Sequence, residues 1–460
     1  NEYDWYCYVE DTNGKSAQTE PDFFVLDKTA PVLKNGGVKY YVDGKDVTAQ
    51  VENGSLFTSK EVKAVVSIDE TNFAAEVSGF ADGQMAVNLT AADNEGNNVD
   101  VTEKFIDAMT SADSWSNWDE KNGLTREMSM TFGDDANYQF GFTYTDLAGN
   151  SVTYNARRFT HDHTNPTGSV TYDTNAGKET WRTFFDLITF NRFKQTEVPV
   201  TFTGEDMTAG VKSIEYYKAY EPMSYEEIEA LPSRDWTSGT SFTVGPNEQF
   251  VPYLKVTDRA DNTEYFSSEF AVVADNTQAS PEIRITAGNP SNGIYNSSVP
   301  FHISVTDPTS GNTYAGLQSV YYEVRRDGQV TQSGNYDSAL QPASRRVKNI
   351  ERDEVVDAQL NNSNDVEIYV RAVDNAGNVS EASQELSIDI TEPTIQVTYD
   401  LNSPLNDRYY NATRTATVVV TERNFDESAV RFDITNTDGT QPSISGWSHS
   451  SDSGVSDSAT

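Results

Sequence analysis

The residues best suited to chemistry in this sequence of 460 residues are aspartates that recur in two short strings. One string, Asp-x-x-Gly-Asn and its variants, begins at Asp11, Asp146, Asp258 and Asp374, and the other, Asp-x-Thr, begins at Asp27, Asp162, Asp275 and Asp389. Carboxylate oxygens are the ligands that Ca²⁺ prefers. If the two strings meet in the fold, calcium is a possible cofactor, with Asp146, Asp162, Asp258, Asp275, Asp374 and Asp389 as its candidate ligands.

A turn or linker cap explains the same aspartates without a metal. Each repeat offers one aspartate from each string rather than a run of acids. An aspartate side chain accepts hydrogen bonds from backbone N–H groups two residues ahead, which is enough to start a turn. The cap is therefore the favoured interpretation, and no metal site is assigned.

The other reactive side chains give weaker signals. Of the four histidines, His161 and His163 flank Asp162 and could hold a metal, but the sequence shows no third ligand. Histidine is too rare, and serine too abundant, for a Ser/His/acid arrangement to be argued. We therefore expect no catalytic residue, no bound organic cofactor and no enzymatic activity.

The spacing of the two strings indicates an internal repeat. The distance from the first aspartate to the second is 15 to 17 residues in all four copies. Apolar residues stand two, four, six and eight positions before each turn aspartate, with few exceptions, a period of two that predicts a strand with one buried face. Cys7 falls on this inward face and is expected to be a buried thiol.

The first string has the chemistry of a hairpin turn. We assign Asp146, Gly149 and Asn150, and likewise Asp374, Gly377 and Asn378, as structural turn residues. Glycine reaches a positive φ without steric cost, and asparagine tolerates it. Asp261 stands where this glycine is expected, so that hairpin is predicted to use a different turn.

Short strands separated by turn signals predict an all-β chain of tandem antiparallel β-sandwiches that form an elongated rod. The one helix expected with a clear start follows Ser224, in a capping-box spacing, and runs to Leu231. The expected boundaries begin with a partial module at residues 1–26, which contributes its last two strands. A long module at residues 27–161 and two short modules at residues 162–274 and 275–388 follow, and a truncated long module occupies residues 389–460.

These strings resemble the bacterial immunoglobulin-like (Ig-like) repeats of large Gram-positive cell-surface and adhesin-type proteins. The segments "TWRTFFDLITFNRFKQ" and "GVKSIEYY" resemble one sub-type, and "ERNF" with "ITNTDGTQPSISGW" resembles another. The resemblance implies Ig-like sandwiches and an extracellular location, on a bacterial cell surface or in a secreted protein.

Composition limits the partners. The formal net charge of −38 and the lack of a basic run argue against nucleic acid and anionic membranes. No apolar stretch approaches the length of a membrane span, so no direct membrane contact is expected. The first residues resemble neither a signal peptide nor an initiator, so we expect a piece of a longer protein. We also expect this piece to be a monomeric rod.

Aromatic clusters are the only candidates for a partner surface. Trp181, Phe184 and Phe185 crowd one segment, and Trp115 and Trp118 lie in a polar insertion where exposed rings could stack on sugars. Packing within their own module is the favoured alternative.

The expected function is the stalk of a bacterial surface or secreted protein, with an adhesive, host-protein-binding region as its further role. One alternative is an immunoglobulin-binding, superantigen-like surface protein of a gut bacterium. The other is a set of accessory, glycan-binding or spacer modules in a secreted glycan-degrading enzyme.

Overall fold

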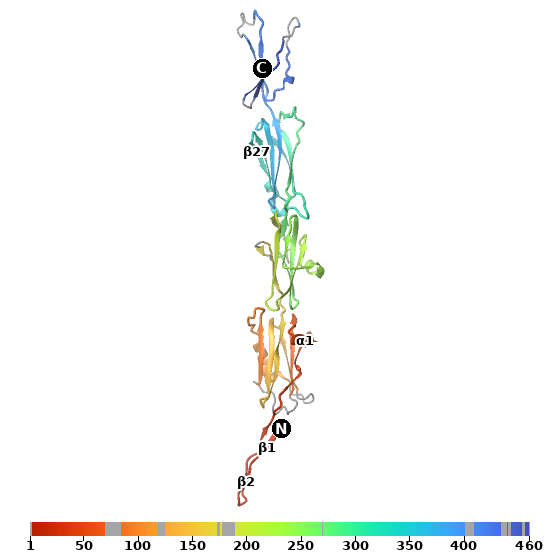
Figure 1. Cartoon of the computed structure of the whole chain (residues 1–460), viewed down its shortest axis with the longest axis vertical. Helices are drawn as coiled ribbons and strands as arrows, with labels where there is room; N and C mark the ends of the chain where they lie inside the picture. Colours follow the sequence, from red (N-terminus) through yellow and green to blue (C-terminus); the bar gives the residue numbers. More distant parts are fainter. Residues whose placement is uncertain are drawn as a thin grey trace. The chain divides into compact units, whose positions relative to one another are not determined.

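The computed structural model describes residues 2–69, 84–116, 125–172, 175–176, 189–268, 270–400, 409–433, 439, 443–452 and 456–459 (Figure 1). The chain divides into two compact units, one of Asn1–Arg192, Glu197–Val244 and Gln249–Val272, the other of Phe193–Thr196, Gly245–Glu248 and Val273–Thr460. Three complete pairs of β-sheets account for most of both units. The module boundaries expected from the sequence stay a prediction, although each pair of sheets lies inside one expected module.

The first pair of sheets is built from residues 32–161. One sheet has the order β10-β8-β5-β6 and the other β7-β12-β11-β9. Their strands are β5 (Val32–Val42), β6 (Lys45–Asp46), β7 (Phe57–Thr58), β8 (Val62–Asp69), β9 (Met85–Ala92), β10 (Thr125–Phe132), β11 (Ala136–Thr145) and β12 (Ser151–His161). The helices α1 (Thr48–Glu52) and α3 (Glu103–Thr110) and the 3₁₀ turn η1 (Ala112–Ser114) lie in the connections.

The second pair of sheets follows the linker after His161. Its orders are β14-β13-β16-β19 and β15-β22-β20-β17-β18, with β21 paired to β20. The strands are β13 (Thr167–Tyr172), β14 (Asn175–Ala176), β15 (Thr189–Lys194), β16 (Val198–Glu205), β17 (Val211–Ala219), β18 (Thr237–Ser238), β19 (Ser241–Val244), β20 (Glu248–Asp258), β21 (Thr263–Ser267) and β22 (Phe270–Ala274). The predicted helix is confirmed as α5 (Tyr225–Glu229), which starts with both capping-box hydrogen bonds of Ser224 and Glu227 and precedes η4 (Ser233–Asp235).

The third pair of sheets has the orders β23-β25-β28 and β24-β30-β29-β26-β27. Its strands are β23 (Ser280–Ile285), β24 (Ile294–Tyr295), β25 (Val299–Thr306), β26 (Leu317–Arg326), β27 (Gln329–Asn335), β28 (Asn349–Val356), β29 (Ser363–Asp374) and β30 (Val379–Ile388), with α6 (Asp337–Leu340) and η5 (Ala343–Arg345) between them. Burial alternates along β25 and β29, as a strand between core and solvent requires.

The two ends of the chain form smaller sheets. At the start, β1 (Glu2–Trp5) pairs with β4 (Asp22–Val25), and β2 (Tyr8–Glu10) pairs with β3 (Ser16–Gln18). At the other end, a sheet of order β31-β32-β34-β33 contains β31 (Thr394–Tyr399), β32 (Ala416–Glu422), β33 (His449–Asp452) and β34 (Ser456–Ala459), with η6 (Glu427–Ala429). The prediction of a buried Cys7 is wrong, because no second sheet covers these first strands in the described part of the chain and the thiol is exposed.

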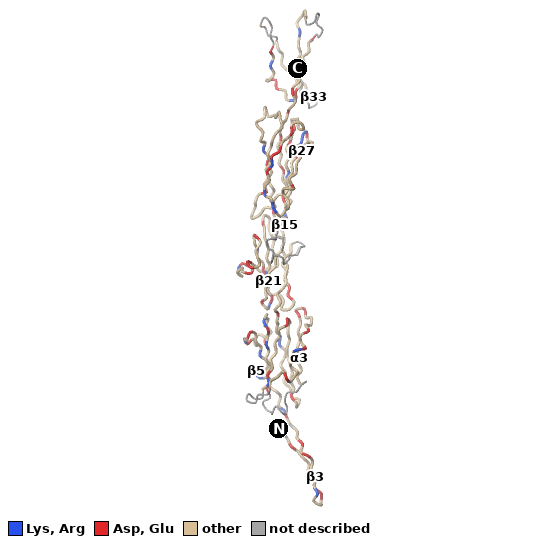
Figure 2. The backbone as a smooth tube through the Cα atoms, turned by 180° about the vertical axis from the view of Figure 1, so that it is seen from behind, with Lys and Arg blue, Asp and Glu red and all other residues tan. Residues whose placement is uncertain are grey.

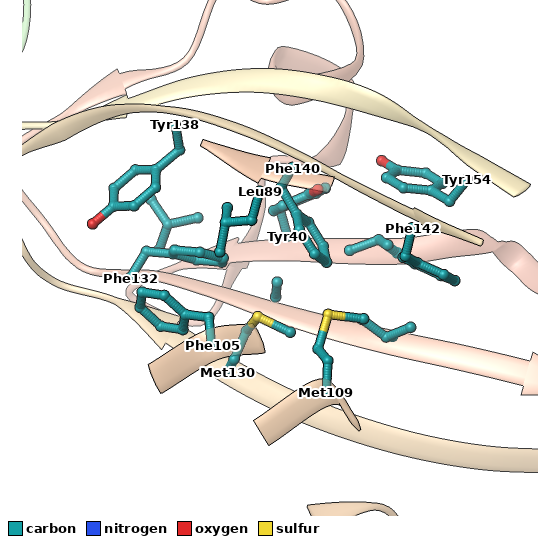
Figure 3. Close-up of a cluster of buried hydrophobic side chains, with 14 of the residues drawn as sticks. Tyr40, Leu89, Phe105, Met109, Met130, Phe132, Tyr138, Phe140, Phe142 and Tyr154 are labelled. Carbon is teal, nitrogen blue, oxygen red and sulfur yellow. The ribbon is translucent and has the colours of Figure 1, made fainter. Parts of the chain in front are cut away.

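The sheets of each pair enclose an apolar core, so the all-β sandwich fold is confirmed. In the first pair, Val62, Ala64 and Val66 of β8 and Phe140 and Phe142 of β11 belong to one buried cluster. Figure 3 shows the aromatic rings of this cluster pointing into the space between the ribbons. Acidic residues occur along the whole chain (Figure 2), which agrees with the strongly negative net charge. No helix in the described ranges is long and apolar enough to cross a membrane.

Replacing Phe132 by alanine tests this core. Phe132 is fully buried and its ring lies 4.5 Å from the ring of Phe105 and 4.9 Å from that of Tyr138, measured between centroids. Removing such a ring leaves a cavity, so we expect the free energy of unfolding to fall by about 3–5 kcal/mol in denaturant titrations. The control, Leu147→Ala at a side chain that is 54% exposed, should cost under about 0.5 kcal/mol.

Candidate metal centres

The hairpin turns predicted from the repeated string are confirmed. Asp146 directly follows β11, and its Oδ1 accepts hydrogen bonds from the backbone N–H groups of Ala148 at 2.9 Å and Asn150 at 2.8 Å. The Asn150 side chain donates to Asp146 Oδ2 at 3.0 Å, and Gly149 has a φ of 91°. Both carboxylate oxygens are thus used to hold the turn.

The same bonds recur in the other two complete modules. Asp374 Oδ1 and Oδ2 accept from the backbone and side chain of Asn378 at 2.9 and 2.7 Å, and Gly377 has a φ of 90°. Asp258 accepts from Asn262 at 2.9 and 2.7 Å. The prediction of a different turn around Asp261 is wrong, because this aspartate adopts the left-handed conformation itself, at a φ of 68°.

The asparagine of each turn also holds the linker that enters the same module. Its side-chain amide donates to the backbone carbonyl of the linker aspartate: Asn262 to Asp162 at 2.9 Å and Asn378 to Asp275 at 2.9 Å. The bond from Asn150 to the Asp27 carbonyl is longer, at 3.5 Å. The two strings therefore meet in the fold, and the turn fixes the position of the linker.

Each linker aspartate begins a turn of its own. Asp162 Oδ1 accepts from the Thr164 N–H at 3.1 Å, and Asp275 Oδ1 accepts from the Thr277 N–H at 2.9 Å. The second oxygen, Oδ2, accepts from the N–H of an alanine across the module, Ala209 at 2.9 Å or Ala315 at 2.6 Å. Both linker carboxylates are fully buried.

A third carboxylate joins each pair, and the sequence analysis did not name it. Asp206 follows β16 and Asp307 follows β25. Asp206 Oδ1 accepts from the Gly210 N–H at 2.7 Å, and Asp307 Oδ2 accepts from the Gly316 N–H at 2.5 Å. The repeated Ala-Gly dipeptide thus supplies N–H donors to two of the three carboxylates.

Two groups of three aspartates result, which we call the first triad (Asp162, Asp206, Asp258) and the second triad (Asp275, Asp307, Asp374). In each triad, one carboxylate oxygen per residue lies within 4.8 Å of the others. All three residues of the second triad are fully buried, whereas Asp206 in the first is partly exposed. Asp307 Oδ1 is buried and has no hydrogen-bond partner among the described residues.

Burial and mutual repulsion disfavour three negative charges in so small a space. Burial raises the pKa of Asp307 to about 7; the Gly316 N–H opposes the rise, and the carboxylates of Asp275 and Asp374 add to it. Burial likewise raises the pKa of Asp162 to about 6, with Asp206 contributing. The pKa values of Asp258 and Asp374 are raised by the same desolvation.

The donor set of both triads fits a hard divalent cation. Two oxygens that each lie about 2.4 Å from one calcium ion are at most about 4.8 Å apart, and the triad oxygens meet that limit. Asp307 Oδ1 supplies a buried acceptor that no donor satisfies in the part of the chain that the structure describes. The ion would be held by the three carboxylates of either triad, Asp162, Asp206 and Asp258 or Asp275, Asp307 and Asp374. It would supply positive charge that offsets their mutual repulsion.

The other two linker aspartates have different surroundings. The Asn150 side chain links the Asp27 carbonyl to Asp146, and Glu70, which follows β8 as Asp206 follows β16, lies outside the described residues. Asp389 lies beside the guanidinium of Arg423 at 3.0 Å and accepts from the Asn424 side chain at 2.5 Å. In the described ranges, neither Asp146 nor Asp389 belongs to a group of three metal-ligating side chains.

The predicted partner-binding aromatics are not supported where the structure describes them. Trp115 is 5% exposed, belongs to the core of its module and donates its Nε1–H to the Met109 carbonyl at 3.1 Å, so its interpretation as a surface ring is wrong. Trp118, Trp181, Phe184 and Phe185 lie outside the described residues.

Comparisons with known proteins give no family for this chain. No protein-family model and no curated protein matches it. Among solved structures, a tetra-tandem repeat in the extending region of a large adhesion protein aligns with 85% of this chain and 82% of its own, at 15% identity and a TM-score of 0.30. Domains A168–A170 of titin align with 78% of this chain and 99% of their own, at 11% identity and a TM-score of 0.25. Likenesses this low carry no argument, and the fold stands on the strand pairing.

Replacing Gly316 by alanine tests the backbone that serves the second triad. A Cβ there would lie 2.5 Å from Arg346 Cα, and the φ of Gly316 is +80°. We expect a loss of about 2–4 kcal/mol in the free energy of unfolding, from clash and left-handed strain together. Gly328→Ala, at a φ of +76° with open space around it, should lose only about 1 kcal/mol. Equal losses would show that close packing against Arg346 is unimportant.

The raised pKa of Asp307 predicts that the stability of the fold depends on pH when a chelator removes free metal ions. The folded chain holds this proton more tightly than the unfolded chain, so stability falls as the pH rises from the ordinary aspartate pKa near 4 toward the folded value of about 7. Thermal unfolding in EGTA should therefore show wild type losing stability relative to Asp307→Asn between pH 5 and pH 8. A difference between the two proteins that is constant with pH would contradict the shift.

Proposed function

We propose that this chain is a non-catalytic stalk region of a bacterial cell-surface or secreted protein, in which calcium ions at the two triads fix the linkers at Asp162 and Asp275 to the modules that follow them. The observation that carries the proposal is the repeated meeting of turn, linker and third carboxylate around one small volume. Two modules of different sequence build this arrangement from the same backbone donors.

A fixed linker suits a spacer better than it suits an enzyme. The residues at each triad are supplied by a turn, a linker and the end of a strand, and their hydrogen bonds run to backbone groups of the same module. A cation bound there stabilises only the arrangement in which all three segments are together. The effect is to restrict the linker, as a stalk of consecutive modules requires.

Calcium is favoured over other cations by the chemistry and by the expected location. The triads offer only oxygen atoms, which hard cations bind, and Ca²⁺ accepts irregular oxygen sets more readily than Mg²⁺ does. Extracellular modules commonly bind calcium weakly, with dissociation constants of about 10⁻⁴–10⁻³ M. A chain with a net charge of −38 also gains from bound cations, because they reduce its self-repulsion.

Each of the two alternative functions requires a surface that binds a partner. Immunoglobulin binding and a role beside a glycan-degrading enzyme both rest on the resemblance of the repeats. Among the described residues, the one proposed sugar-stacking ring, Trp115, is in the core. Binding of antibody by a single module in a pull-down would favour the first alternative, and a catalytic domain in the same polypeptide would favour the second.

Calcium should raise the thermal stability of wild type and lose much of this effect in a triad variant. Asp307→Asn keeps the shape of the side chain and an acceptor for the Gly316 N–H, but removes one of three charges. We expect the variant to be as stable as wild type or more so in EGTA, and calorimetric titration to show one fewer bound calcium. Asp327→Asn, at an aspartate with a largely exposed side chain, is the control for the loss of charge.

Limited proteolysis connects the ion to the linkers. Cleavage within residues 162–166 and 275–279, located by mass spectrometry, should be faster in EGTA than in calcium. Asp307→Asn should make the second linker sensitive in calcium while the first stays protected. Equal cleavage with and without calcium, together with no heat of calcium binding, would overturn the proposal.

A further inference from the structure

A second type of metal-ligand set lies beside the first triad and is built from nitrogen as well as oxygen. His161 ends β12, and its antiparallel partner is Ala136, the first residue of β11. The turn between β10 and β11 therefore brings Asp134 and Asp135 opposite His161 and His163. This pairing supplies the third ligand that the sequence does not show for the two histidines.

Both imidazoles approach the same carboxylate oxygen through the same ring atom. His163 Nδ1 lies 2.6 Å from Asp135 Oδ1, and His161 Nδ1 lies 3.4 Å from it. The backbone carbonyl of Asp134 lies 3.2 Å from His161 Nδ1 and adds a fourth potential donor. Two imidazole nitrogens and one carboxylate oxygen thus lie within 4.8 Å of one another, and the Asp134 carbonyl oxygen lies next to one of the nitrogens.

The carboxylate is oriented by its own hydrogen bonds. Thr164 Oγ1 donates to Asp135 Oδ2 at 2.6 Å, which turns Oδ1 toward the two rings. The His163 N–H donates to Oδ1 at 2.8 Å. Such bonds to the carboxylate arrange a ligand before the metal arrives, and their loss typically weakens metal sites.

The three side chains differ in exposure, which leaves a path by which an ion can enter from solvent. The His161 side chain is 3% exposed and Asp135 is 18% exposed, whereas His163 is 67% exposed. An ion can therefore reach His163 directly from solvent. One buried ligand and one exposed ligand suit a site that is filled from solvent.

We propose that His161, His163 and Asp135 form a site for a divalent transition metal, with Zn²⁺ as its probe. Two imidazole nitrogens and one carboxylate oxygen suit zinc, whereas the oxygen-only triads suit calcium. Asp162, between the two histidines, belongs to the first triad. Three consecutive residues thus serve two sites of different metal preference, and zinc clamps the β10–β11 turn to the start of the linker.

Titration of the full chain with ZnCl₂ tests the site, in buffer that contains calcium so that the triads are occupied. We expect one zinc per chain, and His163→Gln should weaken binding roughly tenfold or more. The matched control is His302→Gln, because His302 Nδ1 also contacts an aspartate, Asp353, at 2.7 Å but belongs to no group of three metal-ligating side chains in the described ranges.

Spectroscopy gives a readout that does not depend on stability. Co²⁺ in place of zinc should give visible absorption bands typical of four-coordinate cobalt, and these should disappear in His163→Gln and weaken in Asp135→Asn. His161 is buried, so its variant is interpreted only if the unfolding curve stays cooperative. Zinc binding that is unaffected in His163→Gln, or that falls equally in His302→Gln, would overturn the proposal and leave the Asp135–His163 contact as an ordinary ion pair.

Discussion

Burial of carboxylates at the ends of the sheets is the interaction on which this structure depends. Asp258 and Asp374 are fully buried, and each is satisfied by the backbone and side chain of one asparagine four residues ahead. A buried charge without such partners costs several kcal/mol. The same asparagine amide reaches the linker carbonyl, so the geometry that satisfies the charge also fixes the entry of the chain into the module.

Fixing the linker in this way creates an electrostatic problem. The fixed linker places its charged aspartate near the turn aspartate. A third aspartate follows the strand that precedes the Ala-Gly dipeptide and lies in the same group. Backbone N–H groups satisfy most of the carboxylate oxygens, but within the described ranges none reaches Asp307 Oδ1. Neutralisation then requires a proton or a cation, and the raised pKa of Asp307 shows how strongly the protein alone favours the proton.

Local patterns were sufficient to predict the strands, the turns and the helix after Ser224, because each depends on neighbours within a few residues. The triads were predicted in part: Asp206 and Asp307 were missed, although each stands one residue after a strand of eight and shortly before Ala-Gly. The predictions for Cys7 and Trp115 were wrong because periodicity does not specify what covers a residue. The burial of Cys7 depends on a second sheet, and that of Trp115 depends on the path of an insertion.

The linker at Asp389 shows a different solution to the same problem, within the protein itself. Burial alone would raise the pKa of Asp389, but hydrogen bonds from Thr391 and Asn424 and the charge of Arg423 hold it below its ordinary value. Arg423 also donates to the Asn362 and Ile388 carbonyls, so one side chain supplies both the positive charge and the tie to the preceding segment. The positive charge at this linker belongs to the chain itself, whereas the calcium proposed for the oxygen-only triads would have to come from the medium.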